Sequence, residues 1–246
     1  MPSVVGAVVD AFARSGVDLA ALGLAWARAL PAVTLVPAFG LRALPAPARG
    51  VLGLAFAACV FPAMAPVGPS AIAGAEPWAL QLVVEVARGL PVAIAAAVPL
   101  WAATMAGGVA DALRGSRETP NVPVVEGAAT PLGVPLSILA SAIFLATGGP
   151  ARVVTALALH PVGAHPLLAA ADDLVGGIAL AVALGGPLLA AAVVLEVAGA
   201  LVARAAAPAQ VHALLAPIRA LGTLAVMAVV LERVATALAK AVESAP

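Results

Sequence analysis

Charge, aromatic residues and cysteine are all scarce in this sequence. Only 10% of its 246 residues are charged and 63% are apolar, whereas an average soluble domain carries about 25% charged and about 45–50% apolar residues. A water-soluble globule of this size could not cover so much apolar surface. The composition therefore excludes a soluble protein and predicts a membrane protein.

The scarcity of particular residue types narrows the class further. Acidic and basic residues balance at 12 each, with no basic stripe or acidic tail, which argues against nucleic acid as a partner. Tyrosine is absent and only five Phe and three Trp occur, so the aromatic girdles typical of lipid-embedded proteins are thin. The single cysteine, Cys59, lies in the run AFAACVF and cannot form an intramolecular disulfide. We expect it to be a buried small side chain.

Motifs for catalysis or cofactor binding are missing as well. The sequence contains no phosphate-binding Gly/Lys/Ser loop and no GxSxG, HExxH or CxxC pattern. In HPVGAHP, Pro161 and the spacing of the two histidines prevent His160 and His165 from sharing a helical face. We therefore expect no enzyme, no cofactor and no metal site.

Long apolar runs indicate the fold class. They are rich in Ala and Leu and lack the strict alternation of barrel strands, so they predict an all-α membrane protein of about six kinked helices or helical hairpins. The run 78–110 is long for one straight span, and we expect Pro91 and Pro99 to kink or split it. We treat 1–246 as a single membrane domain. The runs fall near 19–39, 50–67, 78–110, 132–147, 174–202 and 220–236.

Charge alternates between the loops if each run crosses the membrane once. By the positive-inside rule the more basic side would be cytoplasmic, although Arg233 and Lys240, in the expected tail, would then lie outside. The more basic side would hold Arg42, Arg49, Arg114, Arg117, Arg204 and Arg219, and the other side Arg152, Glu76, Asp172 and Asp173.

Two stretches have the composition of loops. LRALPAPAR, residues 41–49, is predicted to be a Pro-punctuated turn between two helices. Residues 115–135 form the most polar and Pro/Gly-rich part of the chain. A loop of this length in a compact protein is more often functional than merely connecting.

Charged residues inside the apolar runs are the sharpest functional signal. They are Arg28, Glu85, Arg88 and Glu196. Glu85 and Arg88 are three residues apart, so their side chains share one helical face and can reach each other. Charges inside a membrane face protein or water rather than lipid. A transporter would use them for ion coupling and an assembly would use them to fix neighbouring helices; the residues alone leave both roles open.

Four motifs in a fixed order carry a family resemblance. WARALPAVTLVPAFGLRALPAPARGVLGLAFAACVFP (26–62) opens the series, and EVARGLPVAIAAAVPLWAATMAGGVADALRG (85–115) ends in the pattern G-x-x-x-D-x-x-R-G. IFLATGGP (143–150) and LEVAGALVARAAAPAQVHALLAPIRALG (195–222) follow. Together they resemble the FliR/SctT family, the single-copy subunit of the type III secretion export gate in flagella and injectisomes. In that family the third motif is a turn that precedes a short amphipathic helix.

The resemblance implies a role in protein export. It points to a non-enzymatic, multi-pass subunit of the bacterial inner membrane that joins FliP/SctR-like and FliQ/SctS-like subunits in a closed helical channel for unfolded proteins. A FlhB/SctU-like subunit is a further candidate partner. The family's closing segment commonly has adjacent Pro and Gln, whereas Ala209 separates Pro208 from Gln210 here. The alternative function is a small-solute permease with Glu85 or Glu196 as its coupling carboxylate.

Two groups of candidate residues follow from these considerations. The first group would form ion pairs or contacts between helices or subunits. The resemblance implies that the second group belongs to a loop that helps plug the closed gate, for which the alternative is a solvent-exposed linker. The first group is Arg28, Glu85, Arg88, Asp111, Arg114, Glu196, Arg204, Pro208, Gln210 and Pro217, and the second is Arg117, Glu118 and Glu126.

Overall fold

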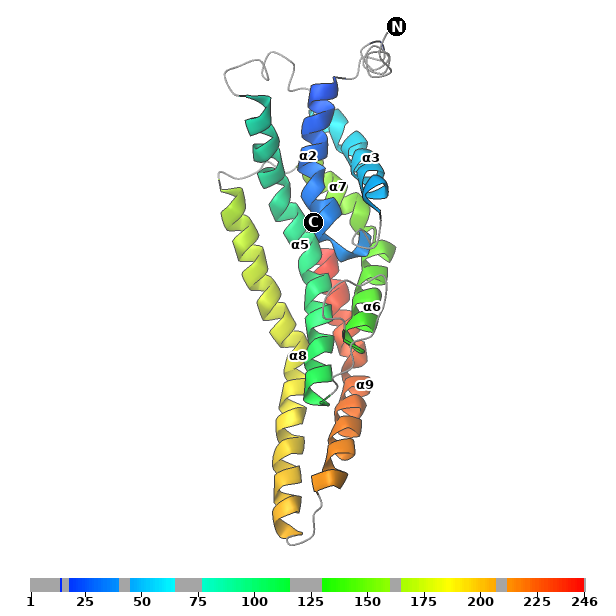
Figure 1. Ribbon diagram of the computed structural model, residues 1–246, viewed down its shortest axis with the longest axis vertical. Helices are drawn as coiled ribbons and strands as arrows, with labels where there is room; N and C mark the ends of the chain where they lie inside the picture. The colour runs from blue at the N-terminus through cyan, green and yellow to red at the C-terminus, as the bar shows by residue number, and fades with distance from the viewer. Residues whose placement is uncertain are drawn as a thin grey trace. The chain divides into compact units, whose positions relative to one another are not determined.

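The protein is helical throughout its described part. The computed structural model describes residues 14, 18–39, 45–64, 77–115, 130–159, 165–206 and 212–245. Within these ranges there is no strand, which confirms the predicted all-α class. The described helices, drawn in Figure 1, are α2 (Leu19–Leu35), the 3₁₀ helix η1 (Pro37–Phe39), α3 (Ala46–Met64), α5 (Trp78–Leu113), α6 (Gly133–Ala146), α7 (Gly149–Leu159), α8 (Pro166–Ala205) and α9 (His212–Ser244).

Contacts between the helices divide the chain into two compact units. The first is formed mainly by Met1–Ala97 and Gly148–Asp173, and the second by Val98–Thr147 and Leu174–Ala245. Helices α5 and α8 each contribute one part to each unit. The prediction of one membrane domain over 1–246 stays a prediction.

In the first unit, α2, α3 and α7 pack side by side (Figure 1). Asp18 caps the N-terminus of α2, because its carboxylate accepts the N–H of Ala20 at 2.8 Å. At the other end of α2, the ring of Phe39 in η1 meets Phe56 of α3 edge to face, with the ring centroids 5.0 Å apart. These contacts fix the position of α2, which carries Arg28.

In the second unit, α6 packs against α9. The part of α5 in this unit buries a stripe of small residues that includes Ala103, Ala106 and Ala110. Small side chains let helix backbones approach one another closely in membrane proteins. The end of α5 can therefore lie against the beginning of α6.

The sequence predicts that Pro91 and Pro99 kink or split the run. Helix α5 runs unbroken through both over its 36 residues, so a split is wrong, while a kink stays a prediction. A proline removes one backbone hydrogen bond from a helix interior. Here Val92, Ala93 and Ile94, directly after Pro91, are all buried. Their packing outweighs the local preference for a break.

The glycine-rich motif IFLATGGP forms the expected turn. Helix α6 ends at Ala146 and the short helix α7 begins at Gly149. Between them Gly148 has a φ of 76°, a left-handed conformation that favours glycine. The turn that the third motif predicts is therefore confirmed.

Helix α3 differs from the sequence-based expectation in two ways. It begins at Ala46, inside the stretch 41–49 that was predicted to be a turn; residues 40–44 lie outside the described part. The expected burial of Cys59 is also wrong, because this side chain is exposed. Its neighbours Ala57 and Val60 occupy the buried positions of the helix instead.

Most of the charged residues that were assigned to loops lie in helices, among them Arg49, Arg152, Arg204 and Arg219. Asp172 and Asp173 fall inside α8, not in a connection between spans. Arg233 and Lys240 fall inside α9, not in a tail. Charge alone does not end a helix in a sequence rich in Ala and Leu, which have high helix propensity.

Three described helices are long and apolar enough to cross a membrane. They are Trp78–Leu113, Pro166–Ala205 and Pro217–Ser244, and α6 with α7 could count as a fourth, broken span. Helix α2 and residues Pro47–Ala63 of α3 are shorter apolar helices. By length, the described helices thus do not support six separate crossings, because the first two runs are too short.

Candidate functional site

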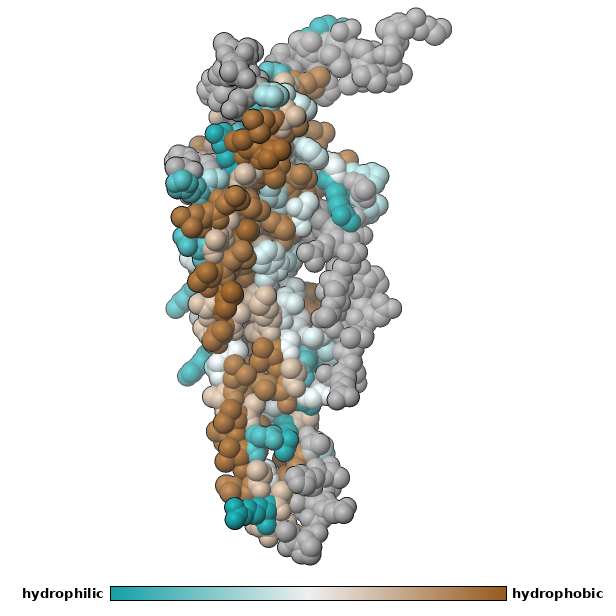
Figure 2. Space-filling model, turned by 60° about the vertical axis from the view of Figure 1, so that its left-hand side comes forward, coloured by the Kyte–Doolittle hydropathy of each residue, from teal (hydrophilic) through white to brown (hydrophobic). Residues whose placement is uncertain are grey.

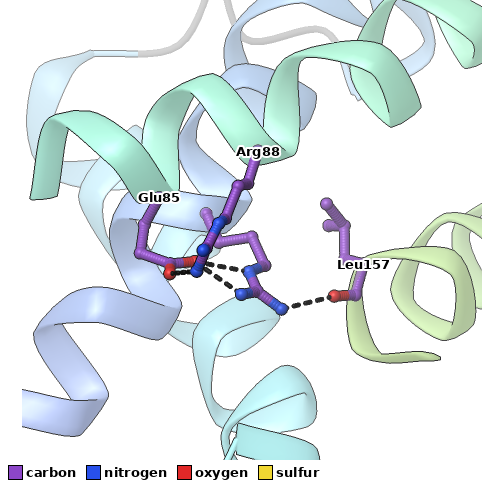
Figure 3. Close-up of polar contacts among 4 residues, drawn as sticks. Glu85, Arg88 and Leu157 are labelled. Atoms are coloured by element: carbon purple, nitrogen blue, oxygen red, sulfur yellow. Dashed lines mark hydrogen bonds and ion pairs between the residues drawn. The ribbon is translucent and has the colours of Figure 1, made fainter. Parts of the chain in front are cut away.

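Glu85 is the centre of an ion-pair cluster that joins α2 to α5. Its Oε2 accepts hydrogen bonds from Arg28, with Nε at 2.7 Å and Nη2 at 2.6 Å. Its Oε1 accepts from Nη1 of Arg88 at 2.7 Å. Figure 3 shows Glu85 and Arg88 leaving the same helix and meeting beside it. The contact that the three-residue spacing predicts is therefore present, and both carboxylate oxygens are engaged.

Arg28 also connects this cluster to α7. Its Nη1 donates a hydrogen bond to the backbone carbonyl of Leu157 at 3.3 Å (Figure 3). Leu157 lies in the last turn of α7, where helix carbonyls lack a partner within the helix. A cation at a helix C-terminus is also favoured by the helix dipole. One guanidinium thus holds three helices together.

The cluster is buried on one side and open on the other. Glu85 is only 6% exposed, whereas the side chain of Arg88 is 44% exposed. Two cations around one carboxylate leave a formal charge of about +1. Gly89 makes the arrangement possible, because a side chain at this position would collide with the backbone carbonyl of Arg28. The close approach of α2 to α5 that brings Arg28 to Glu85 therefore depends on a glycine.

A second cluster surrounds Asp111, near the end of α5. Asp111 is 2% exposed. Its Oδ1 accepts from Nε of Arg114 at 2.7 Å, and its Oδ2 accepts the backbone N–H of Leu132 at 2.7 Å. Leu132 directly precedes α6, so its N–H has no acceptor within that helix. The carboxylate therefore joins the end of α5 to the start of α6.

Two glycines allow this junction to form. A Cβ on Gly107 would lie 2.5 Å from the backbone nitrogen of Gly133, so the two helices touch through their backbones. The hydroxyl of Thr130 accepts the N–H of Gly133 at 3.0 Å and satisfies a second donor at the start of α6. Gly115, with a φ of 72°, follows the end of α5 in a left-handed conformation. Each fixed residue of the pattern G-x-x-x-D-x-x-R-G thus has a role. Gly107 forms the contact between the helices, and Asp111 caps the start of α6. Arg114 is the counter-ion of Asp111, and Gly115 follows the end of α5.

Glu196 of α8 and Arg219 of α9 form a third ion pair, at 2.8 Å. The pair borders an open cavity of about 270 Å³ whose wall also includes Leu113 and Thr223. The side chain of Glu196 is 63% exposed in the single chain. It lies on a helix face that other parts of its own unit leave uncovered.

The remaining candidates lie apart from these clusters or outside the described residues. Arg204 is exposed in the last turn of α8, where a cation is favoured by the helix dipole. Pro217 is exposed in the early part of α9. The candidates that lie outside the described residues are Arg117, Glu118, Glu126, Pro208 and Gln210.

Several partners in these clusters were missed from the sequence. Two are backbone groups, the carbonyl of Leu157 and the N–H of Leu132, for which no residue type provides a signal. Thr130, three residues before Gly133, is a capping pattern that could have been recognised. The pairing of Glu196 with Arg219 could not be read from spacing, because the two residues lie on different helices.

A family comparison agrees with the order of the motifs. A family model described as bacterial export proteins, family 1, matches residues 19–245, a range that contains all the described helices and the three ion-pair clusters. No curated protein matches the sequence. Members of this family are structural components of a membrane-embedded export apparatus that contains further subunits. The chain belongs to the bacterial export proteins, family 1, the FliR/SctT family, and is a membrane component of the type III or flagellar export apparatus.

Proposed function

We propose that this chain is a non-enzymatic subunit of the type III protein export gate. It would assemble with FliP/SctR-like and FliQ/SctS-like subunits in the bacterial inner membrane as a multi-pass protein, with a FlhB/SctU-like subunit as a further partner. Together they would form a closed helical channel for unfolded proteins. Family membership supports this proposal, and one feature of the helices favours an assembly over a single-chain protein.

That feature is the uncovered surface of α8, the most apolar of the candidate spans. Only 17% of its most apolar segment is buried, against 67% for α5. Figure 2 shows apolar side chains gathered on the visible surface. The exposed apolar residues of α8 in the second unit include Val175, Ile178, Val182, Val193, Val194 and Leu201.

The exposed carboxylate of Glu196 favours partner helices, and not lipid alone, as the neighbours of this surface. The carboxylate is largely exposed among the apolar residues of α8 and, within the described part of the chain, forms an ion pair with Arg219. A charge in contact with lipid tails is costly, and such groups normally face protein or water. A neighbouring subunit would remove Glu196 from lipid and would bury the apolar residues around it.

The segment after the R-G motif, about 116–130, would help plug the closed gate. This role rests on the family resemblance, with Arg117, Glu118 and Glu126 as its charged residues. The hydrogen bond between Asp111 and Leu132 holds the start and the end of this connection close together.

The permease alternative would use Glu85 or Glu196 as its coupling carboxylate. Both oxygens of Glu85 are engaged by arginines, and Glu196 is paired with Arg219. These ion pairs favour a structural role for both carboxylates.

Co-purification tests the proposal directly. The chain is tagged, expressed together with the two neighbouring candidate partner genes, and the purified complex is weighed by native mass spectrometry. One copy of the chain with several copies of two small helical proteins would support the export gate. A stable particle that contains only this chain would overturn the proposal and favour a permease.

A further inference from the structure

Helix α8 contains a Gly-Gly-Pro sequence near its middle that close packing does not explain. Gly185 and Gly186 precede Pro187 inside the helix. A Cβ on Gly186 would meet nothing within 4 Å, and one on Gly185 would lie 3.9 Å from Val109, an ordinary contact. Gly107 differs, because a Cβ there would collide with backbone atoms. Alanine would fit at both positions of α8 and has the higher helix propensity, so these glycines need another reason.

The same three residues weaken the backbone of the helix. Pro187 has no N–H, so the carbonyl of Ala183 loses the donor that a helix normally supplies four residues later. Glycine leaves the backbone more conformational freedom than any other residue. Prolines and pairs of small residues are the usual sites of bends in long helices. Both causes act at one place in α8.

On the N-terminal side of this sequence, α8 lies against α5. A Cβ on Gly177 would be 2.7 Å from a methyl group of Val98, so the two helices are in close contact there. The contact continues where Gly185 meets Val109. Helix α5 ends four residues after Val109, at Leu113, and Figure 1 shows α8 and α9 extending beyond this end. The Gly-Gly-Pro sequence therefore lies close to the point where α8 leaves α5.

On the C-terminal side, α8 is tied to α9. Glu196 and Arg219 form their ion pair at 2.8 Å. A Cβ on Gly222 would lie 2.9 Å from a methyl group of Leu195, so the two helices also approach closely. These contacts join two helix segments into one body. We call it the hairpin arm, and it consists of residues 188–205 of α8 and 212–222 of α9.

An open cavity lies beside the base of the hairpin arm. It has a volume of about 270 Å³, and its wall includes Leu113 at the end of α5 and Leu189, Ala192 and Val193 in the first turns of the arm. Protein interiors are normally close-packed, and such packing resists movement. The first turns of the arm border a cavity instead, so a rotation of the arm relative to α5 would meet little steric resistance there.

We infer that Gly185, Gly186 and Pro187 form a hinge about which the hairpin arm pivots as one body relative to α5. The arm joins the rest of its unit at this hinge and at Gly222 of α9, and glycine permits a bend at both places. The pivot keeps the ion pair inside the arm intact and changes the distance from the arm to the end of α5. The inference rests on contacts within the second unit, so it does not depend on the proposed export gate.

Distances between spin labels test the inference in the full chain. The chain is purified from membranes with the subunits that accompany it, made without cysteine, and placed in lipid nanodiscs. In a Cys59→Ala background, Met105→Cys on α5 with Leu201→Cys on the arm forms the pair across the hinge. Met105→Cys with Ile178→Cys, and Leu201→Cys with Leu221→Cys, are control pairs on either side of it. All four labelled positions are exposed in the single chain.

The distance distribution of the pair across the hinge should be about twice as wide as that of either control pair, because hinge motion adds to the motion of the labels. A distribution as narrow as those of the controls would overturn the inference and would show that α8 is rigid at Pro187. This comparison needs no substitution in the hinge itself.

A variant with Gly185→Ala and Gly186→Ala tests whether the glycines are the hinge. Both alanines fit without a clash and restrict the backbone, so the distribution across the hinge should narrow towards the width of the controls. Gly176→Ala is the matched control on the same helix, because a Cβ there also meets nothing within 4 Å; it should leave the width unchanged. An equal width in both variants would overturn the assignment of the hinge to these glycines.

Discussion

The carboxylate of Asp111 accepts the backbone N–H of Leu132 at 2.7 Å and so joins the end of α5 to the start of α6. Its other oxygen accepts from Nε of Arg114, also at 2.7 Å. The carboxylate is buried, and it is charged, paired and hydrogen-bonded at the same time. A buried charge of this kind is tolerated because both of its oxygens have partners.

Asp111→Ala should destabilise the purified complex strongly, by about 3–5 kcal/mol, because it breaks a buried ion pair. It also removes the acceptor of the Leu132 N–H. Asp111→Asn should cost less, since an amide oxygen can still accept that N–H. Thermal unfolding of the complex measures both effects, with Glu232→Ala, an exposed carboxylate, as the control. Equal midpoints for Asp111→Ala and the control would contradict the role given to Asp111.

A second prediction follows from the backbone contact between Gly107 and Gly133. A Cβ on Gly107 would lie 2.5 Å from backbone atoms of Gly133, which cannot move aside as a flexible side chain could. Gly107→Ala should therefore destabilise the protein by about 1–3 kcal/mol, as overpacking does in other cores.

A matched glycine on α8 provides the control. A Cβ on Gly186 would meet nothing within 4 Å, so Gly186→Ala should be neutral or should stabilise the helix by up to about 1 kcal/mol. Circular dichroism during thermal unfolding compares the two variants. If Gly107→Ala unfolds at the same temperature as Gly186→Ala, the backbones are not in contact.

The helices themselves were largely predictable from the sequence. Long apolar runs and the spacing of Glu85 and Arg88 are local features, and local features predict helices and contacts within them. The split in the run that was expected at Pro91 is absent, which shows the limit of this reasoning. A proline predicts a break from its own chemistry, but the burial of the residues that follow it depends on distant parts of the chain.

The clusters were predictable only in part, for a different physical reason. Arg28 and Glu85 each stood out as a charge in an apolar run, but 57 residues separate them, and no spacing rule links positions on two helices. The acceptors and donors supplied by the backbone are invisible in a sequence, because every residue type carries them. Family resemblance identified Asp111 and Arg114 as a motif, and only the structure shows what they bind.

Glu85→Gln should impair the complex more than Glu196→Gln. Glu85 is buried and both of its oxygens are engaged, so its neutralisation leaves Arg28 without a counter-charge at a cost of about 3–5 kcal/mol. Glu196 is exposed in the single chain and has one ion-pair partner. Recovery of partner subunits with the tagged chain measures both variants. A larger loss with Glu196→Gln would place the decisive ion pair at the surface of α8.

Arg28→Lys should be harmful although it keeps the charge. Arg28 donates through Nε and two terminal nitrogens, to Glu85 and to the Leu157 carbonyl, and a lysine cannot reproduce this planar fork. Arg88→Lys should be tolerated, because Arg88 makes a single contact to Glu85 and is half-exposed. Thermal unfolding of the two complexes separates the outcomes. Equal stability would show that charge, and not guanidinium geometry, holds the three helices.

Deletion of residues 118–126 should make the assembled complex leak small ions. These residues include Glu118 and Glu126 and belong to the segment that we propose as a plug of the closed gate. Removing them should open a path without disturbing the Asp111–Leu132 junction, which lies outside the deletion. Ion flux is measured in proteoliposomes that contain the purified complex.

A Gly/Ser segment of equal length is the matched control, because it keeps the connection unstrained while removing the native side chains. Leakage with both variants would assign the seal to those side chains, whereas leakage with the deletion alone would assign it to the volume that the segment occupies. Unchanged flux in an assembled, inserted complex would rule the plug out.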